Sequence, residues 1–84
     1  MQDVDLPSLT GLTFTEGATP LTAEFDTVPA ATGPVWFEFG DGTWDFVEAP
    51  GSTDHVYDAA GTYTVRATQD GGNWVTATVI VPFP

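Results

Sequence analysis

The chain has 84 residues, no cysteine and a formal net charge of −11 at pH 7. A chain of this length closes one hydrophobic core, and without cysteine neither disulfides nor thiolate metal sites can stabilise it, so packing must. Twelve carboxylates against one cationic side chain, Arg66, exclude nucleic acid and anionic membranes as favoured partners, because like charges repel.

Short runs of period-two alternation, separated by Gly, Pro and Asp, predict an all-β fold of about seven strands. Leu12 and Phe14 open the pattern, and Ala23 and Phe25 continue it in a second strand. Residues 27–33 then form a loop, because they contain a proline and a glycine. The pattern predicts a single antiparallel all-β domain at residues 9–84, preceded by an N-terminal arm at residues 1–8.

The third strand and the hairpin after it hold most of the aromatic residues. Phe37 and Phe39 alternate with Trp36 and Glu38, which gives the strand an apolar and a polar side. A two-residue type I′ turn at Asp41-Gly42 fits the Gly-Asp-Gly sequence. This turn would pair Phe39 with Trp44 and Phe37 with Phe46 on the core face, so that Trp36, Glu38, Asp45 and Val47 point outward.

The last three strands follow a loop at residues 49–53. A short strand is expected at residues 54–57 and a turn at residues 58–61. In the final hairpin a three-residue loop, residues 71–73, pairs Asp70 with Trp74, Ala67 with Ala77 and Val65 with Val79, so both apolar rows share one face. The outer face then carries Thr62, Thr64, Arg66, Thr68, Trp74, Thr76, Thr78 and Ile80.

Three stretches of the chain resemble the PKD domain, an immunoglobulin-like sandwich family. They are residues 19–26 (TPLTAEFD), residues 37–42 (FEFGDG) and residues 55–57 (HVY) with residues 61–65 (GTYTV). Their order and spacing agree with the family pattern, and the resemblance covers residues 9–81. Phe37 and Glu38 stand where the family commonly has Trp and Asp, which keeps a large aromatic side chain in the core.

The resemblance implies structural roles for most of the motif residues. Tyr63 resembles the tyrosine corner of immunoglobulin-like sandwiches, whose hydroxyl bonds to nearby backbone. His55, the single histidine, is expected to be a hydrogen-bonded packing residue, and Asp41 to accept amide hydrogen bonds in its turn. The full set of structural motif residues is Phe37, Phe39, Gly40, Asp41, Gly42, His55, Tyr57, Gly61 and Tyr63.

Catalytic and metal sites are not expected. The chain has neither Cys nor Lys, and Ser8 and Ser52 lie in loop-like sequence, so no activated nucleophile can be named. No cofactor is expected. Calcium is the weaker alternative, since oxygen ligands from loops suit it, but the aspartates near turns do not have EF-hand spacing; they are Asp41, Asp45, Asp54, Asp58 and Asp70.

Two functions follow from this resemblance. The first is a structural protein of a phage virion, a decoration protein that docks on the capsid and stabilises it. It fits residues 1–5, which lack the features of a secretory signal, and would be assembled in the host cytoplasm. The alternative is an accessory module of a secreted bacterial enzyme or adhesin, which binds carbohydrate or protein.

The expected partner is a protein, namely a capsid or other virion protein, and a homo-oligomer is a further possibility. The candidate interface residues are apolar side chains on the outward parity of their strands, because exposed large side chains concentrate at binding surfaces. These candidates are Trp36, Val47, Trp74 and Ile80.

Overall fold

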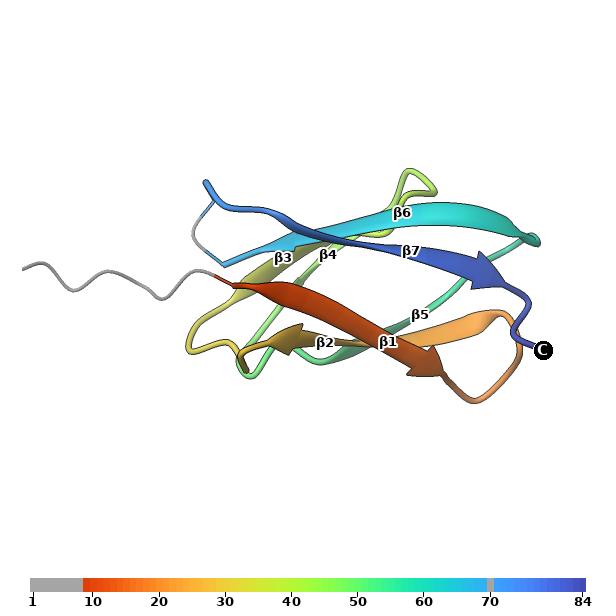
Figure 1. Ribbon diagram of the computed structural model, residues 1–84, viewed down its shortest axis with the longest axis horizontal. Helices are drawn as coiled ribbons and strands as arrows, with labels where there is room; N and C mark the ends of the chain where they lie inside the picture. Colours follow the sequence, from red (N-terminus) through yellow and green to blue (C-terminus); the bar gives the residue numbers. More distant parts are fainter. Residues whose placement is uncertain (1–8, 70) are drawn as a thin grey trace, which may run out of the picture.

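The computed structural model describes residues 9–69 and 71–84, so the predicted N-terminal arm at residues 1–8 and Asp70 lie outside the described residues. The described residues form strands and turns, with no helix among them (Figure 1). The strands are β1 (Gly11–Glu16), β2 (Thr22–Val28), β3 (Val35–Glu38), β4 (Trp44–Val47), β5 (Thr53–Val56), β6 (Gly61–Thr68) and β7 (Val75–Val81).

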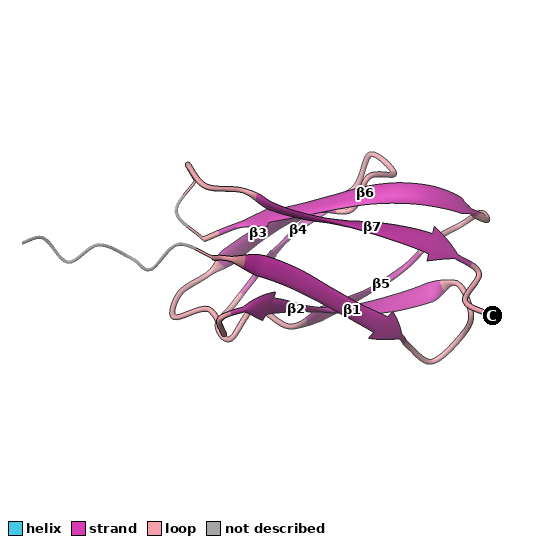
Figure 2. Ribbon diagram, viewed as in Figure 1, coloured by secondary structure: helices cyan, strands magenta, loops and turns pink. Residues whose placement is uncertain are grey.

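These strands form two antiparallel sheets that face each other as a sandwich (Figure 2). One sheet has the order β1-β2-β5, and the other has the order β4-β3-β6-β7. The predicted all-β, immunoglobulin-like fold of seven strands is therefore confirmed. The short fifth strand lies one residue earlier than the sequence pattern suggested, at Thr53–Val56.

Aromatic and branched side chains fill the space between the sheets. Phe25 of β2 meets two phenylalanines of the opposite sheet, with ring centroids 6.3 Å from Phe37 and 5.9 Å from Phe39. Alternation along each strand sends these side chains inward, and burying such a side chain stabilises the fold by about 1.5–3 kcal/mol. The buried apolar residues are Leu9, Leu12, Ala23, Phe25, Ala31, Val35, Phe37, Phe39, Tyr57, Val65, Ala67, Val79 and Val81.

The loop between β3 and β4 is one residue longer than expected. The Phe39 N–H donates to the Thr43 carbonyl at 3.1 Å, which leaves Gly40, Asp41 and Gly42 as the loop. Both glycines have positive φ, 88° and 93°, whereas Asp41 does not. The predicted type I′ turn, which needs positive φ at Asp41, is therefore wrong.

The longer loop shifts the register of the β3–β4 hairpin by one residue. Trp36 stands opposite Phe46, and Glu38 stands opposite Trp44. Because side chains alternate with period two, this shift turns Trp44 and Phe46 from the core face to the outer face. The prediction that both pack beside Phe37 in the core is wrong.

The last hairpin differs from its predicted register by two residues, which has a milder effect. Val65 pairs with Ala77 and Ala67 with Val75, so the loop is longer than the predicted three residues. A shift of two preserves the face of every side chain, and the apolar rows still point inward. Thr68 also keeps its face, opposite Trp36, but it is buried at the end of β6 and not exposed as predicted.

Candidate functional site

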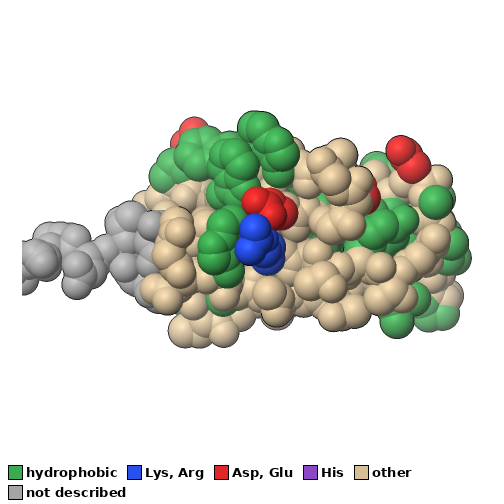
Figure 3. All heavy atoms as spheres, turned by 90° about the horizontal axis from the view of Figure 1, so that it is seen from above, with side chains coloured by type: hydrophobic (Ala, Val, Ile, Leu, Met, Phe, Trp, Pro, Cys, Tyr) green, Lys and Arg blue, Asp and Glu red, His purple; other side chains and the backbone are tan. Residues whose placement is uncertain are grey.

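Four aromatic side chains gather on the outer face of the β4-β3-β6-β7 sheet, and we call them the aromatic surface: Trp36, Trp44, Phe46 and Trp74. Trp44 and Phe46 are 57% and 58% exposed, whereas both other members are half-buried. The rings of Trp36 and Trp44 stack, with centroids 4.3 Å apart and planes 10° apart, and Phe46 meets Trp36 edge-on at 6.1 Å. In Figure 3 hydrophobic side chains gather beside the cationic side chain and a neighbouring carboxylate.

The polar side chains within the aromatic surface form a network around Glu38, which we call the Glu38 network. The Arg66 Nε–H donates to Glu38 Oε1 at 2.8 Å, and the Trp36 Nε1–H donates to Glu38 Oε2 at 3.1 Å. The Arg66 guanidinium carbon also lies 4.1 Å from the centre of the Trp74 ring, at cation–π distance. The hydrogen bonds from Arg66 and Trp36 hold the pKa of Glu38 below its ordinary value.

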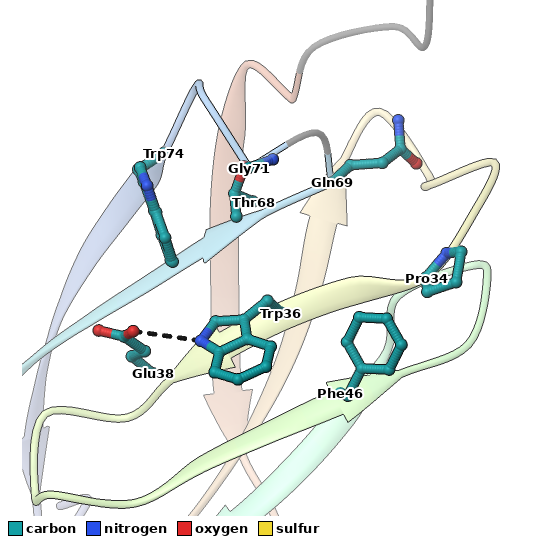
Figure 4. Close-up of a pocket in the computed structure, with 8 residues that line it drawn as sticks. All are labelled: Pro34, Trp36, Glu38, Phe46, Thr68, Gln69, Gly71 and Trp74. Carbon is teal, nitrogen blue, oxygen red and sulfur yellow. Dashed lines mark hydrogen bonds between the residues drawn. The ribbon is translucent and has the colours of Figure 1, made fainter.

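An open groove of about 430 Å³ runs along the aromatic surface (Figure 4). Trp36 and Phe46 line it from β3 and β4, and Trp74 lines it from the chain just before β7. Gln69 adds a polar side chain at the rim, where its Oε1 accepts backbone N–H bonds from the β2–β3 loop. The groove is thus mostly apolar, with a few polar groups, as binding sites usually are.

A second carboxylate, Asp41, lies in the loop of the same hairpin and organises other aromatic residues, in what we call the Asp41 network. Asp41 Oδ2 lies 2.8 Å from His55 Nε2, and Asp41 Oδ1 accepts the Thr43 N–H at 3.0 Å. The His55 ring stacks on Phe39 at 4.0 Å and meets Tyr57 edge-on at 4.6 Å. His55 is therefore a hydrogen-bonded packing residue, as predicted.

Two tyrosine hydroxyls extend this network to the backbone. The buried Tyr57 hydroxyl donates to the Phe39 carbonyl at 2.8 Å, and burial raises the pKa of Tyr57. The Tyr63 hydroxyl donates to the Ala59 carbonyl at 2.8 Å, which confirms the predicted tyrosine corner. The rings of both tyrosines stack at 4.2 Å, so these hydroxyls hold loops and strand ends together.

The family model of the PKD domain matches residues 10–83. The chain belongs to the PKD domain family. Neither a curated protein nor a solved structure matches it significantly. PKD domains are generally non-catalytic structural or binding modules. The Asp41 network ties the hairpin loop to the buried ring of Phe39, which leaves the aromatic surface as the candidate site.

The interface candidates proposed from the sequence of this PKD domain occupy different positions. Trp36 and Trp74 lie together at the groove, each half-buried. Ile80 is 64% exposed on β7 of the same sheet. Val47 was expected to point outward, but it stands opposite Val35 and packs against the core, because the hairpin register moved by one. An interface role for Val47 is therefore not supported.

Two members of the aromatic surface, Trp44 and Phe46, were missed by the sequence analysis, which placed them in the core. Gly-Asp-Gly carries no decisive signal for their exposure. Its glycines tolerate positive φ in the three-residue loop, and the same sequence also fits the predicted two-residue turn. The pairing of Glu38 with Arg66 across β3 and β6 carries no local signal, since the residues are far apart in the chain.

The part of the PKD domain that the structure describes holds no group of three or more His, Asp or Glu side chains placed to bind a metal ion. The aspartates considered as calcium ligands thus do not converge within residues 9–69 and 71–84, and Asp70 lies outside these ranges. With no helix among them, the described residues offer none that is long and apolar enough to cross a membrane.

Proposed function

We propose that this PKD domain is a non-enzymatic docking module that binds a protein partner through the aromatic surface. The observation that carries the proposal is the exposure of Trp44 and Phe46 beside the groove. Large aromatic side chains are enriched at binding hot spots, because they bury much area at a low entropic cost. A contiguous aromatic patch does not improve the solubility of a small acidic domain, so binding of a partner that covers the patch explains why it is there.

The charge of the chain narrows the chemistry of the partner. The net charge of −11 repels acidic proteins and nucleic acid, whereas Arg66 and Glu38 neutralise each other inside the aromatic surface. The complementary surface is therefore apolar at its centre and neutral or basic around it. Our specific proposal is the outer surface of a phage capsid, on which the domain acts as a decoration protein that stabilises the shell. On the outer surface, the shell separates this strongly acidic domain from the packaged nucleic acid, which would repel it.

A second candidate is an accessory module of a secreted enzyme or adhesin, supported by the shape of the groove. Tryptophan rings at both sides of an open groove, with a carboxylate and a guanidinium between them, also suit a neutral carbohydrate chain. A neutral ligand meets no repulsion from the net charge of −11. Both candidates use the same side chains and differ in the ligand.

The test is co-sedimentation of the purified domain with capsids assembled from the major capsid protein encoded in the same genome. We expect wild-type protein to pellet with the capsids and Trp44→Ala to lose at least about tenfold in affinity, as hot-spot residues do. Val56→Ala is the matched control, because Val56 is 60% exposed on the opposite sheet. Circular dichroism must show that both variants are folded.

The outcomes separate the two candidates. Absence of wild-type protein from the capsid pellet would contradict the virion role. Retention on insoluble polysaccharide that Trp44→Ala abolishes would then support the accessory module. Equal binding of Trp44→Ala and wild type to every ligand that binds would exclude the aromatic surface as the site.

A further inference from the structure

The two sides of the groove come from different parts of the chain and share one carboxylate. Trp36 lies on β3, whereas Trp74 lies just before β7, at the far end of the same sheet. Each carboxylate oxygen of Glu38 serves one side of the groove. Oε2 accepts the Trp36 indole N–H, and Oε1 accepts the Nε–H of Arg66. The Arg66 guanidinium in turn covers the Trp74 ring. Figure 4 shows the Glu38 carboxylate beside the Trp36 indole, with the hydrogen bond between them.

We propose that Glu38 is a positioning residue that holds both tryptophans of the groove in their binding orientation, directly for Trp36 and through Arg66 for Trp74. The sheet register makes this arrangement possible, because Glu38 stands opposite Arg66 on β6 and opposite Trp44 on β4. Directly opposed residues in a sheet lie close enough for their side chains to interact. The hydrogen bond between Glu38 and Arg66 therefore joins two neighbouring strands, and it forms without any rearrangement of a loop.

The Glu38 network is expected to contribute little to the stability of the fold. A positioning role therefore explains the network better than a stabilising role does. The side chains of Arg66 and Glu38 are 47% and 37% exposed, and ion pairs at such positions add little to stability. Their effect is on side-chain freedom instead. A free indole loses rotamer entropy when a partner binds, and a side chain that is already fixed does not pay this cost again.

Arg66 suits this role better than a lysine would. Its planar guanidinium can bond a carboxylate at one edge while its face lies on an aromatic ring, whereas an ammonium group acts as a point charge. The chain contains one cationic side chain in all, and its place is in the aromatic surface. Arg66→Lys is therefore expected to release Trp74 while Glu38 still holds Trp36.

The inference rests on the proposed function only for its effect on partner binding, so its test has a spectroscopic part that needs no partner. Glu38→Gln in ¹⁵N-labelled protein is compared with wild type through the indole N–H resonances. We expect the Trp36 and Trp74 resonances to shift. Glu24→Gln is the control, because it makes the same charge change at an exposed position on β2 in the opposite sheet, and it should leave both resonances unchanged.

The binding part uses the capsids named above. Glu38→Gln should weaken co-sedimentation by about two- to tenfold, which corresponds to the ordering of one or two side chains. Its thermal midpoint should match that of Glu24→Gln. Arg66→Lys should shift the Trp74 resonance and leave the Trp36 resonance in place.

Each outcome has one meaning. Unchanged Trp36 and Trp74 resonances in Glu38→Gln overturn the positioning role, whatever the binding result. Full capsid binding by Glu38→Gln, with binding lost in Trp44→Ala, overturns its effect on affinity. Shifted resonances together with full binding by Trp44→Ala support the positioning role and overturn the proposed function instead.

Discussion

Glu38 and Asp41 lie at the same end of β3, and each carboxylate accepts hydrogen bonds that order aromatic side chains, yet the two networks differ in burial. Asp41 contacts His55, which stacks on the buried ring of Phe39. Glu38 contacts Arg66 and Trp36 on the outer face of the sheet, beside solvent. The three-residue spacing of the two carboxylates, across a positive-φ glycine, places them on separate parts of the molecule.

The difference shows how the same chemistry serves the fold in one place and a surface in another. A hydrogen bond to a charged group adds about 1.5–3 kcal/mol where solvent is excluded, and much less where water competes. The His55 and Asp41 side chains are 17% and 21% exposed, less than those of Arg66 and Glu38, and His55 packs on the buried Phe39 ring. The Asp41 network is therefore expected to stabilise the domain more than the Glu38 network does. The Glu38 network orders exposed rings without adding much stability.

The largest expected effect comes from Gly40→Ala, at the glycine that lies between the two carboxylates in the chain. Gly40 has φ of 88°, and a Cβ there would lie 2.5 Å from the Thr64 carbonyl oxygen on β6. Backbone strain and this clash should destabilise the domain by about 2–5 kcal/mol. Gly42→Ala is the matched control, because Gly42 has a similar φ but open space around it, and should cost about 1–2 kcal/mol. Urea unfolding measures both, and equal losses would contradict the close packing of Gly40.

The next effect is smaller and depends on pH. Partial burial, which raises the pKa of Asp41, is outweighed by hydrogen bonds from Thr43 and His55, so that pKa lies below its ordinary value of about 3.9. A lowered carboxylate pKa stabilises the folded state above the unfolded-state pKa, and this stability is lost as the pH falls through the folded-state pKa. Asp41→Asn should therefore cost about 1–2 kcal/mol near pH 6.

The loss in Asp41→Asn should shrink as the pH falls through the lowered folded-state pKa of Asp41, because wild-type Asp41 then becomes protonated. Denaturant unfolding of both proteins between about pH 2 and 6 measures this. Glu38→Gln, whose carboxylate also has a lowered pKa but is exposed to solvent, should show the same trend with a smaller amplitude. A loss that stays constant with pH would argue against an ionised Asp41 in the network.

The smallest expected effect is that of calcium. Both carboxylates of the comparison already accept hydrogen bonds from protein donors, and the other aspartates of the described residues do not converge on one point. Millimolar calcium added after chelation should move the melting temperature no more than an equal concentration of magnesium does. A calcium-specific rise of several degrees in the melting temperature would contradict this expectation and indicate a calcium site.

Much of the fold could be predicted because local patterns carry it. Alternation places Phe25, Phe37 and Val65 in the core whatever the partner strand is, since the period of a strand is two. The PKD motif likewise placed Tyr63 and His55 in structural roles, and their hydrogen bonds confirm those roles. In the last hairpin even a wrong loop length preserved the inward face, because the error was two residues.

The aromatic surface depends on tertiary structure. Whether Trp44 and Phe46 face the core or solvent depends on one residue of loop length, and Gly-Asp-Gly is compatible with a loop of either length. Packing between the two sheets determines the outcome. Phe37, Phe39 and side chains of the opposite sheet fill the core, so the aromatic side chains of β4 face solvent. The contact between Glu38 and Arg66 arises in the same way, because it requires β3 and β6 to become neighbours.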